Sequence, residues 1–157
     1  MKNRAIIIGY PGRHTLGMLR SLGEKNVDVY LLIRGGKNNI LQKSKYVFKS
    51  WVVDNSYEDM LNVIIENFPI STIKPVLFPG TDFDVAFVEK YFDLLKDRFI
   101  CPSVKGRGEG LINLMDKNYV NRLAKEAGLN VPQSWIINTN HDNIEVPNDM
   151  IYIIFIH

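Results

Sequence analysis

The sequence has almost no cysteine, and its charges nearly balance. Cys101 is the only cysteine among the 157 residues, so an internal disulfide cannot form and nothing calls for an oxidising compartment. Nineteen basic residues against seventeen acidic ones give a net charge of +2. This balance is too even for a protein that is held to nucleic acid or to an anionic membrane mainly by charge. We therefore expect no nucleic-acid partner.

Long apolar runs are also missing. The two longest, Ala5–Ile8 and Ile151–Ile156, are far shorter than the ~20 residues that a membrane-spanning helix needs. The basic residues at the start, Met1–Arg4, precede an apolar run that is too short for a signal peptide. We expect a soluble, cytoplasmic protein without a membrane partner. Its 46% hydrophobic content is sufficient for a folded core of ordinary size.

Strand-like and helix-like patterns alternate up to about residue 102. Short apolar runs predict strands, and apolar residues at helical spacing predict helices between them. The expected strands are Ala5–Ile8, Val27–Ile33, Tyr46–Val53, Pro75–Phe78 and Phe99–Pro102; the expected helices are His14–Lys25, one that follows an N-cap at Ser56, and one that follows an N-cap at Asp82. This order predicts an α/β domain with a doubly wound, mainly parallel, Rossmann-like sheet.

Ligands of such sheets bind where the strands end at their carboxyl side. In this sequence the segments after the strands are Gly9–Arg13, Arg34–Asn39 and Pro79–Asp82. These three segments are therefore the candidates for a binding site. Thr81 and Asp82 are of interest because a residue that caps a helix at this edge also faces the ligand crevice.

A dinucleotide site is disfavoured, although Gly9–Gly17 stands where a Rossmann turn would be. The glycine spacing is not that of the G-x-G-x-x-G fingerprint, and Pro11 removes a backbone donor. The second strand ends in Ile33 and Arg34, without an acidic residue for a ribose. The simplest interpretation is a tight turn with close helix–strand packing at Gly17; a loop that lines a substrate site is the functional alternative.

Other catalytic motifs are missing as well. The sequence has no P-loop, its three histidines are scattered, and its serines lack a nucleophile-elbow context. We assign no catalytic residue and no metal ligand.

The last third of the chain has a different pattern. Lys117 opens an amphipathic helix that Gly128 ends in the C′ position. A strand is expected over Gln133–Asn138 and an apolar run follows at Met150–Ile156. A lysine in the first turn opposes the helix dipole, but one exposed lysine is ordinary surface.

Taken together, these segments resemble a known family. Leu114–Lys117 and Ala124–Pro132 resemble the segment that joins the N-terminal domain of ATP-grasp ligases to their ATP-binding part. Leu19–Gly23 and Lys74–Phe83 resemble that N-terminal domain. The resemblance covers residues 4–138 and points to carboxylate–amine ligases similar to carbamoyl-phosphate synthase, the D-aspartate-ligase-like subgroup.

The resemblance implies a pre-ATP-grasp domain in residues 1–104. Residues 105–157 would then be a linker helix and the start of a truncated ATP-grasp domain. Family members use ATP and Mg²⁺ to convert a small carboxylate into an acyl-phosphate, from which an amine displaces phosphate to give an amide. The oligomeric state stays open, although ligases of this type are commonly dimers through this domain.

The family's functional positions can be carried over residue by residue. The lysine of the Asp-Lys motif reaches the ATP phosphates, and here it is Lys117. The residues that match the carboxylate site are Gly9, Gly12, Arg13, Thr81 and Asp82.

The sequence departs from the family after residue 138. Where the family has a strand with an ATP-binding lysine, this chain has Ile151–His157 and then stops. We therefore expect that residues 1–157 have no ligase activity alone and bind ATP at most weakly. The uncharged run Ile151–Ile156 is expected to pair with another chain or to promote aggregation.

Two other interpretations compete with the ligase. One is a stand-alone α/β module that senses a small acidic metabolite or docks to a separate catalytic chain, and it predicts micromolar binding of that ligand. The other is a nucleotide-cofactor enzyme of the Rossmann type, which predicts binding of NAD(P). The interpretation as a ligase fragment predicts very weak binding of ATP.

Overall fold

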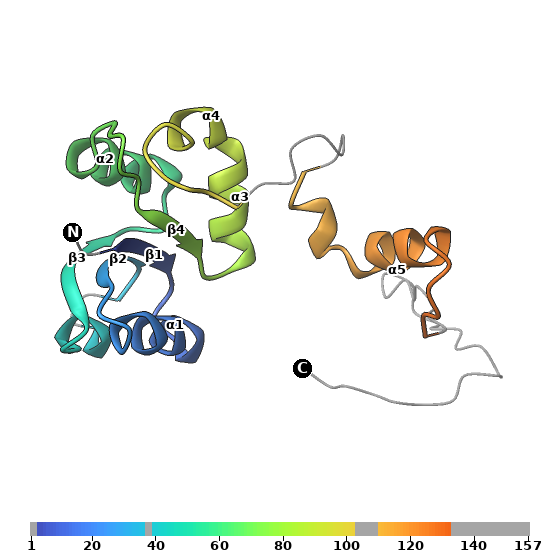
Figure 1. The fold of residues 1–157 in the computed structure, drawn as a ribbon, viewed down its shortest axis with the longest axis horizontal. Helices are drawn as coiled ribbons and strands as arrows, with labels where there is room; N and C mark the ends of the chain where they lie inside the picture. Colours follow the sequence, from blue (N-terminus) through green and yellow to red (C-terminus); the bar gives the residue numbers. More distant parts are fainter. Residues whose placement is uncertain (1–2, 37–38, 103–109, 133–157) are drawn as a thin grey trace, which may run out of the picture. The chain divides into compact units, whose positions relative to one another are not determined.

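The computed structural model describes residues 3–36, 39–102 and 110–132. Contacts divide the chain into one unit of residues 1–120 and another of residues 121–157. Along the chain the elements are β1 (Arg4–Gly9), α1 (Arg13–Gly23), β2 (Asp28–Arg34), the short 3-10 helix η1 (Ile40–Lys43), β3 (Val47–Val53), α2 (Tyr57–Asn67), β4 (Val76–Pro79), α3 (Asp82–Lys90), α4 (Phe92–Leu95), the 3-10 helix η2 (Asn113–Met115) and α5 (Lys117–Glu126) (Figure 1). The predicted boundary at residues 104 and 105 stays a prediction.

The four strands form one parallel sheet in the order β3-β2-β1-β4. β1 is central, because Ala5 lies opposite Val29 of β2 and opposite Val76 of β4. Its residues from Ala5 to Gly9 are all buried, as expected for a strand that is covered on both faces. The sequence-based expectation of a parallel, Rossmann-like α/β sheet is confirmed.

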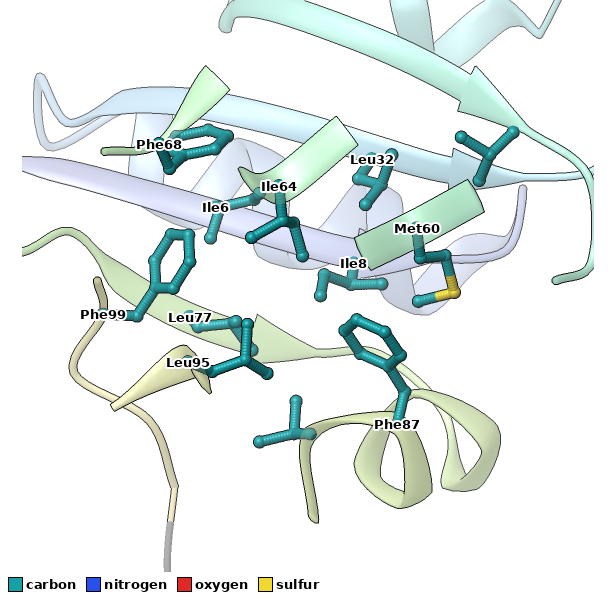
Figure 2. Close-up of a cluster of buried hydrophobic side chains, with 12 residues drawn as sticks. Ile6, Ile8, Leu32, Met60, Ile64, Phe68, Leu77, Phe87, Leu95 and Phe99 are labelled. Atoms are coloured by element: carbon teal, nitrogen blue, oxygen red, sulfur yellow. The ribbon is translucent and has the colours of Figure 1, made fainter. Parts of the chain in front are cut away.

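Helices cover both faces of the sheet. On one face Leu19 of α1 and Leu41 of η1 pack against Ile7, Leu31 and Ile33. On the other face α2 and α3 supply Met60, Ile64 and Phe87, which pack against Ile6, Ile8 and Leu32 (Figure 2). Successive strand residues thus alternate between two apolar layers, which is the period-two pattern of a pleated sheet. Full burial of each such side chain contributes about 1.5–3 kcal/mol.

The predicted fifth strand is wrong. Within Phe99–Pro102 a single bridge joins Ile100 to Val76, with the Leu77 amide donating to the Ile100 carbonyl at 2.9 Å. Phe99 is buried in the core cluster that contains Ile6 and Leu77, whereas Ile100 is 58% exposed. Pro102 has no amide hydrogen for a ladder, so the pairing cannot extend beyond this point.

The helix α5 ends as the sequence predicts. Gly128 has a φ of +75°, the Leu129 amide donates to the Ala124 carbonyl, and the Gly128 amide donates to the Lys125 carbonyl. These two bonds define a Schellman C-cap. The strand expected over Gln133–Asn138 and the apolar run Met150–Ile156 lie outside the described residues. In the described part of the chain, no helix is long and apolar enough to cross a membrane.

Candidate functional site

The candidate site lies where the carboxyl ends of β1 and β4 meet. From β1 the chain continues into α1 on one face of the sheet, and from β4 it continues into α3 on the other. A parallel sheet has its ligand crevice at such a switch point. The Gly80 amide donates to the Ile8 carbonyl at 2.8 Å, so the two strand ends are in direct contact. The two sets of predicted site residues therefore share one edge.

The turn after β1 is closed by a side chain of α1. Thr15 is buried, and its hydroxyl donates to the Tyr10 carbonyl at 2.7 Å. A Cβ on Gly9 would lie 2.7 Å from that same hydroxyl oxygen, so only glycine fits there without a shift. The expected close packing at Gly17 is wrong, because a Cβ there would meet nothing within 4 Å. The close approach is at Gly9 instead.

The amino end of α1 has positive electrostatic character. Gly12 is the N-cap residue and has no side chain that could accept hydrogen bonds from the amides of the first turn. Arg13 and His14 are exposed in that turn, which contains no acidic residue. The partial positive charge of a helix N-terminus adds to the charge of the guanidinium. This end of the crevice is therefore suited to an anion.

The amino end of α3 has the opposite character. Thr81, and not Asp82 as predicted, is the N-cap residue: its hydroxyl accepts from the Asp84 amide at 3.4 Å. Asp82 is instead the first residue of the helix and is exposed. Thr81 and Asp82 are both cap-forming types one position apart, so the sequence alone does not separate them. The acidic groups of this first turn disfavour a second anion.

A buried ion pair lies beneath this turn, and it was not predicted. The Nε of Arg34, the last residue of β2, donates to Oδ1 of Asp84 at 2.8 Å. The two side chains are 6% and 0% exposed. Arg34 also donates from Nη1 to Asn55 Oδ1 and from Nη2 to Thr81 Oγ1 at 3.0 Å. The Phe83 ring covers the guanidinium, with its centroid 4.1 Å from the central carbon.

These contacts bear on the dinucleotide alternative. An arginine near the end of the second strand can hold the 2′-phosphate of NADP in a Rossmann enzyme. Here all three nitrogens of Arg34 already donate to protein oxygens, and the group is buried. Three of its five N–H donors are thus used within the protein, and burial disfavours Arg34 as the partner of such a phosphate.

Lys117 is the first residue of α5 and is exposed. Asp116 precedes it, and its Oδ1 accepts from the Asn118 amide at 2.8 Å. The Asp-Lys pair thus has a local structural role, in which the aspartate caps the helix. Its role towards ATP stays a prediction.

Within the described ranges, no group of three or more His, Cys, Asp or Glu side chains could hold a metal ion.

Neither a scan against models of protein families nor a search of curated proteins gives a match to this chain.

Proposed function

We propose that this chain is the N-terminal part of an ATP-dependent carboxylate–amine ligase that acts through an acyl-phosphate. In this proposal residues 1–104 are a domain of the pre-ATP-grasp type, and the segment from residue 105 leads into an ATP-grasp domain. One observation carries the proposal: β1 and β4 are neighbours, so Gly12 and Arg13 share the switch-point edge with Thr81 and Asp82. These are the positions that the family resemblance assigns to the carboxylate site.

The two helix ends at this edge suggest how a substrate is held. Arg13 is exposed and can form a bidentate pair with a carboxylate, which an uncapped helix N-terminus reinforces. Asp82 is exposed on the other side of the edge and can accept a hydrogen bond from a hydroxyl or ammonium group of the same molecule. The proposed substrate is accordingly a small carboxylate with a polar second group.

The residues described do not by themselves make a site for ATP and Mg²⁺. Lys117 is one exposed cation, and within the described ranges no cluster of three carboxylate, imidazole or thiol groups could hold the metal. Phosphoryl transfer needs several cationic groups and magnesium around the phosphates. In this proposal phosphoryl transfer belongs to the complete ligase, and the residues described here contribute to binding of the carboxylate.

Binding of small carboxylates to the 157-residue chain tests the proposal. In ¹H–¹⁵N NMR titrations with a panel of small mono- and dicarboxylates and amino acids, we expect shifts at the amides of Gly12, Arg13 and Asp82. Arg13→Gln should weaken binding about tenfold or more, because it removes the charge of Arg13 and at least one hydrogen bond of the bidentate pair. Arg20→Gln is the matched control, because Arg20 is exposed in the last turn of the same helix.

The outcomes separate the candidate functions. The proposal fails if no carboxylate perturbs this edge, or if Arg20→Gln weakens binding as much as Arg13→Gln does. ATP should bind weakly, with a small further loss in Lys117→Ala relative to Lys125→Ala in the same helix. Micromolar binding of an acidic metabolite that does not depend on Arg13 would favour the stand-alone binding module instead.

A further inference from the structure

We infer that Arg34 is a positioning residue for the switch-point edge: its guanidinium fixes the turn between β4 and α3, and with it Asp82, relative to β2 and β3. The inference rests on the proposed function in that this turn borders the proposed carboxylate site. Arg34 itself is buried, and it contacts the edge of that site through its hydrogen bond to Thr81.

The three donor nitrogens of Arg34 reach three separate places in the fold. Nε binds Asp84 in α3, Nη1 binds Asn55 just after β3, and Nη2 binds Thr81 just after β4. A guanidinium is planar and rigid, so its donors hold fixed angles to one another. Arg34 therefore joins the carboxyl ends of three strands through one rigid group.

Thr81 links Arg34 to the first turn of α3 through its hydroxyl group. Its hydroxyl accepts from Arg34 and donates to Oδ2 of Asp84 at 2.6 Å. Because a hydroxyl has one hydrogen, this geometry leaves Thr81 no side-chain proton for a ligand. Thr81 contributes to the edge by holding the turn in place.

The residue between the two anchors is Asp82. Thr81 and Asp84 are both bound to Arg34, and Phe83 packs on the guanidinium and accepts from the Tyr57 hydroxyl at 3.2 Å through its carbonyl. Asp82 is exposed while the residues on either side of it are held. An exposed carboxylate on a fixed backbone is what a preorganised binding edge requires.

Two variants test the inference. Arg34→Lys keeps a positive charge beside Asp84, but an ammonium cannot reproduce the planar fork to Asn55 and Thr81. The double variant Arg34→Met/Asp84→Leu replaces the buried ion pair with apolar side chains, a change that often leaves stability intact. Arg20→Met serves as a control for loss of an exposed arginine in α1.

Native-state amide exchange is the first measurement, and it needs no ligand. The Asp84 and Val85 amides both donate to the Thr81 carbonyl, at 3.0 Å each, and so report on the turn. We expect both variants to exchange these amides about tenfold faster or more, the equivalent of one charge-assisted hydrogen bond. Amides of the sheet, such as those of Ile7 and Leu31, should keep their wild-type rates.

The inference is overturned if the turn amides keep their wild-type rates in both variants. It is equally overturned if all amides lose protection to the same degree, because Arg34 would then support overall stability only. The double variant separates a local effect on the turn from a loss of overall stability, because its thermal midpoint should remain near that of the wild type.

Carboxylate titration of the same variants is the second measurement. If the wild type binds a carboxylate, Arg34→Lys should weaken that binding about tenfold while sheet amides stay protected. If the wild type binds none, the proposed function fails, and the exchange rates still decide whether Arg34 positions the turn. The two failures are thus distinguishable.

Discussion

At the scale of single residues, the tightest packing at the candidate site is around Gly9. We expect Gly9→Ala to lower the free energy of unfolding by about 1–3 kcal/mol, the usual cost of overpacking. The reason is the 2.7 Å separation between the new Cβ and the Thr15 hydroxyl oxygen. Urea denaturation of the variant measures this loss.

A double-mutant cycle identifies the cause. Thr15→Ala alone loses the hydrogen bond to Tyr10, about 1 kcal/mol. In Gly9→Ala/Thr15→Ala the clash is removed, so the combined loss should be smaller than the sum of the two single losses. Strict additivity would contradict this explanation.

Gly17 lies in α1 and has open space where a Cβ would be added. Gly17→Ala should therefore raise the free energy of unfolding by about 0.5–1 kcal/mol in the same urea denaturation.

The Cys101 thiol is half-buried, and this changes its chemistry. Burial raises its pKa to about 11, although the positive charge of Lys74 acts in the opposite direction. An unfolded thiol ionises at about 8.5, so between these values the unfolded chain loses its proton while the folded chain keeps it. The contribution of the thiol to stability is present below about pH 8.5 and is lost as the pH rises through about 11.

Alkylation kinetics measure this shift. At pH 8 the folded chain should react with iodoacetamide about tenfold more slowly, or slower still, than the urea-unfolded chain, because the thiolate is the reactive form. The rate for the folded chain should continue to rise towards pH 11. A rate that levels off near pH 9, as for an exposed thiol, would show that the Cys101 thiol is not shielded.

The site residues show what can be predicted at this scale. The segments directly after the apolar runs place Gly9, Gly12, Arg13, Thr81 and Asp82 at one edge once the strands are known to be parallel. The Arg34–Asp84 pair could not be predicted in this way, because the partners are distant in sequence and each alone resembles a surface charge. Its only signal is an arginine that directly ends a run of buried strand residues.

At the scale of elements, local signals predict most of the boundaries. A continuous, β-branched apolar run predicted β1, the apolar-rich segment Val27–Ile33 predicted β2, and Ser56 predicted the start of α2. The predicted strand at Phe99–Pro102 failed because apolar, strand-prone residues do not reveal whether a neighbouring strand is available over their whole length. A lone bridge at Ile100 satisfies the same sequence pattern.

The N-cap of α2 is an independent test of such local signals. The Ser56 hydroxyl accepts from the amides of Glu58 and Asp59 at 3.2 and 3.4 Å. We expect Ser56→Ala to lower the free energy of unfolding by about 1 kcal/mol in urea denaturation, because these amides lose their acceptor. Ser21→Ala in the interior of α1 is the control and should be neutral or slightly stabilising. Equal losses in both variants would argue against a capping role.

At the scale of the whole molecule, the apolar run Ile151–Ile156 lies outside the described residues, and its prediction rests on sequence alone. Six uncharged, strand-prone residues without proline favour intermolecular pairing. We expect the chain without Ile151–His157 to show less self-association by light scattering than the full chain at equal concentration. Unchanged association after the deletion would remove this run from any account of oligomerisation.

The strand order also has a consequence for biosynthesis. β1, α1, β2 and β3 are complete once residue 53 has been made. The face that carries Ile6, Ile8 and Leu32 is covered by side chains made later, among them those of α2 and α3, which end at Asn67 and Lys90. The second edge of β1 stays unpaired until β4 is made. At ordinary rates of translation this interval lasts on the order of seconds. During it the nascent chain presents an apolar sheet face together with an open strand edge, a combination that chaperones bind and that makes neighbouring nascent chains a hazard to one another.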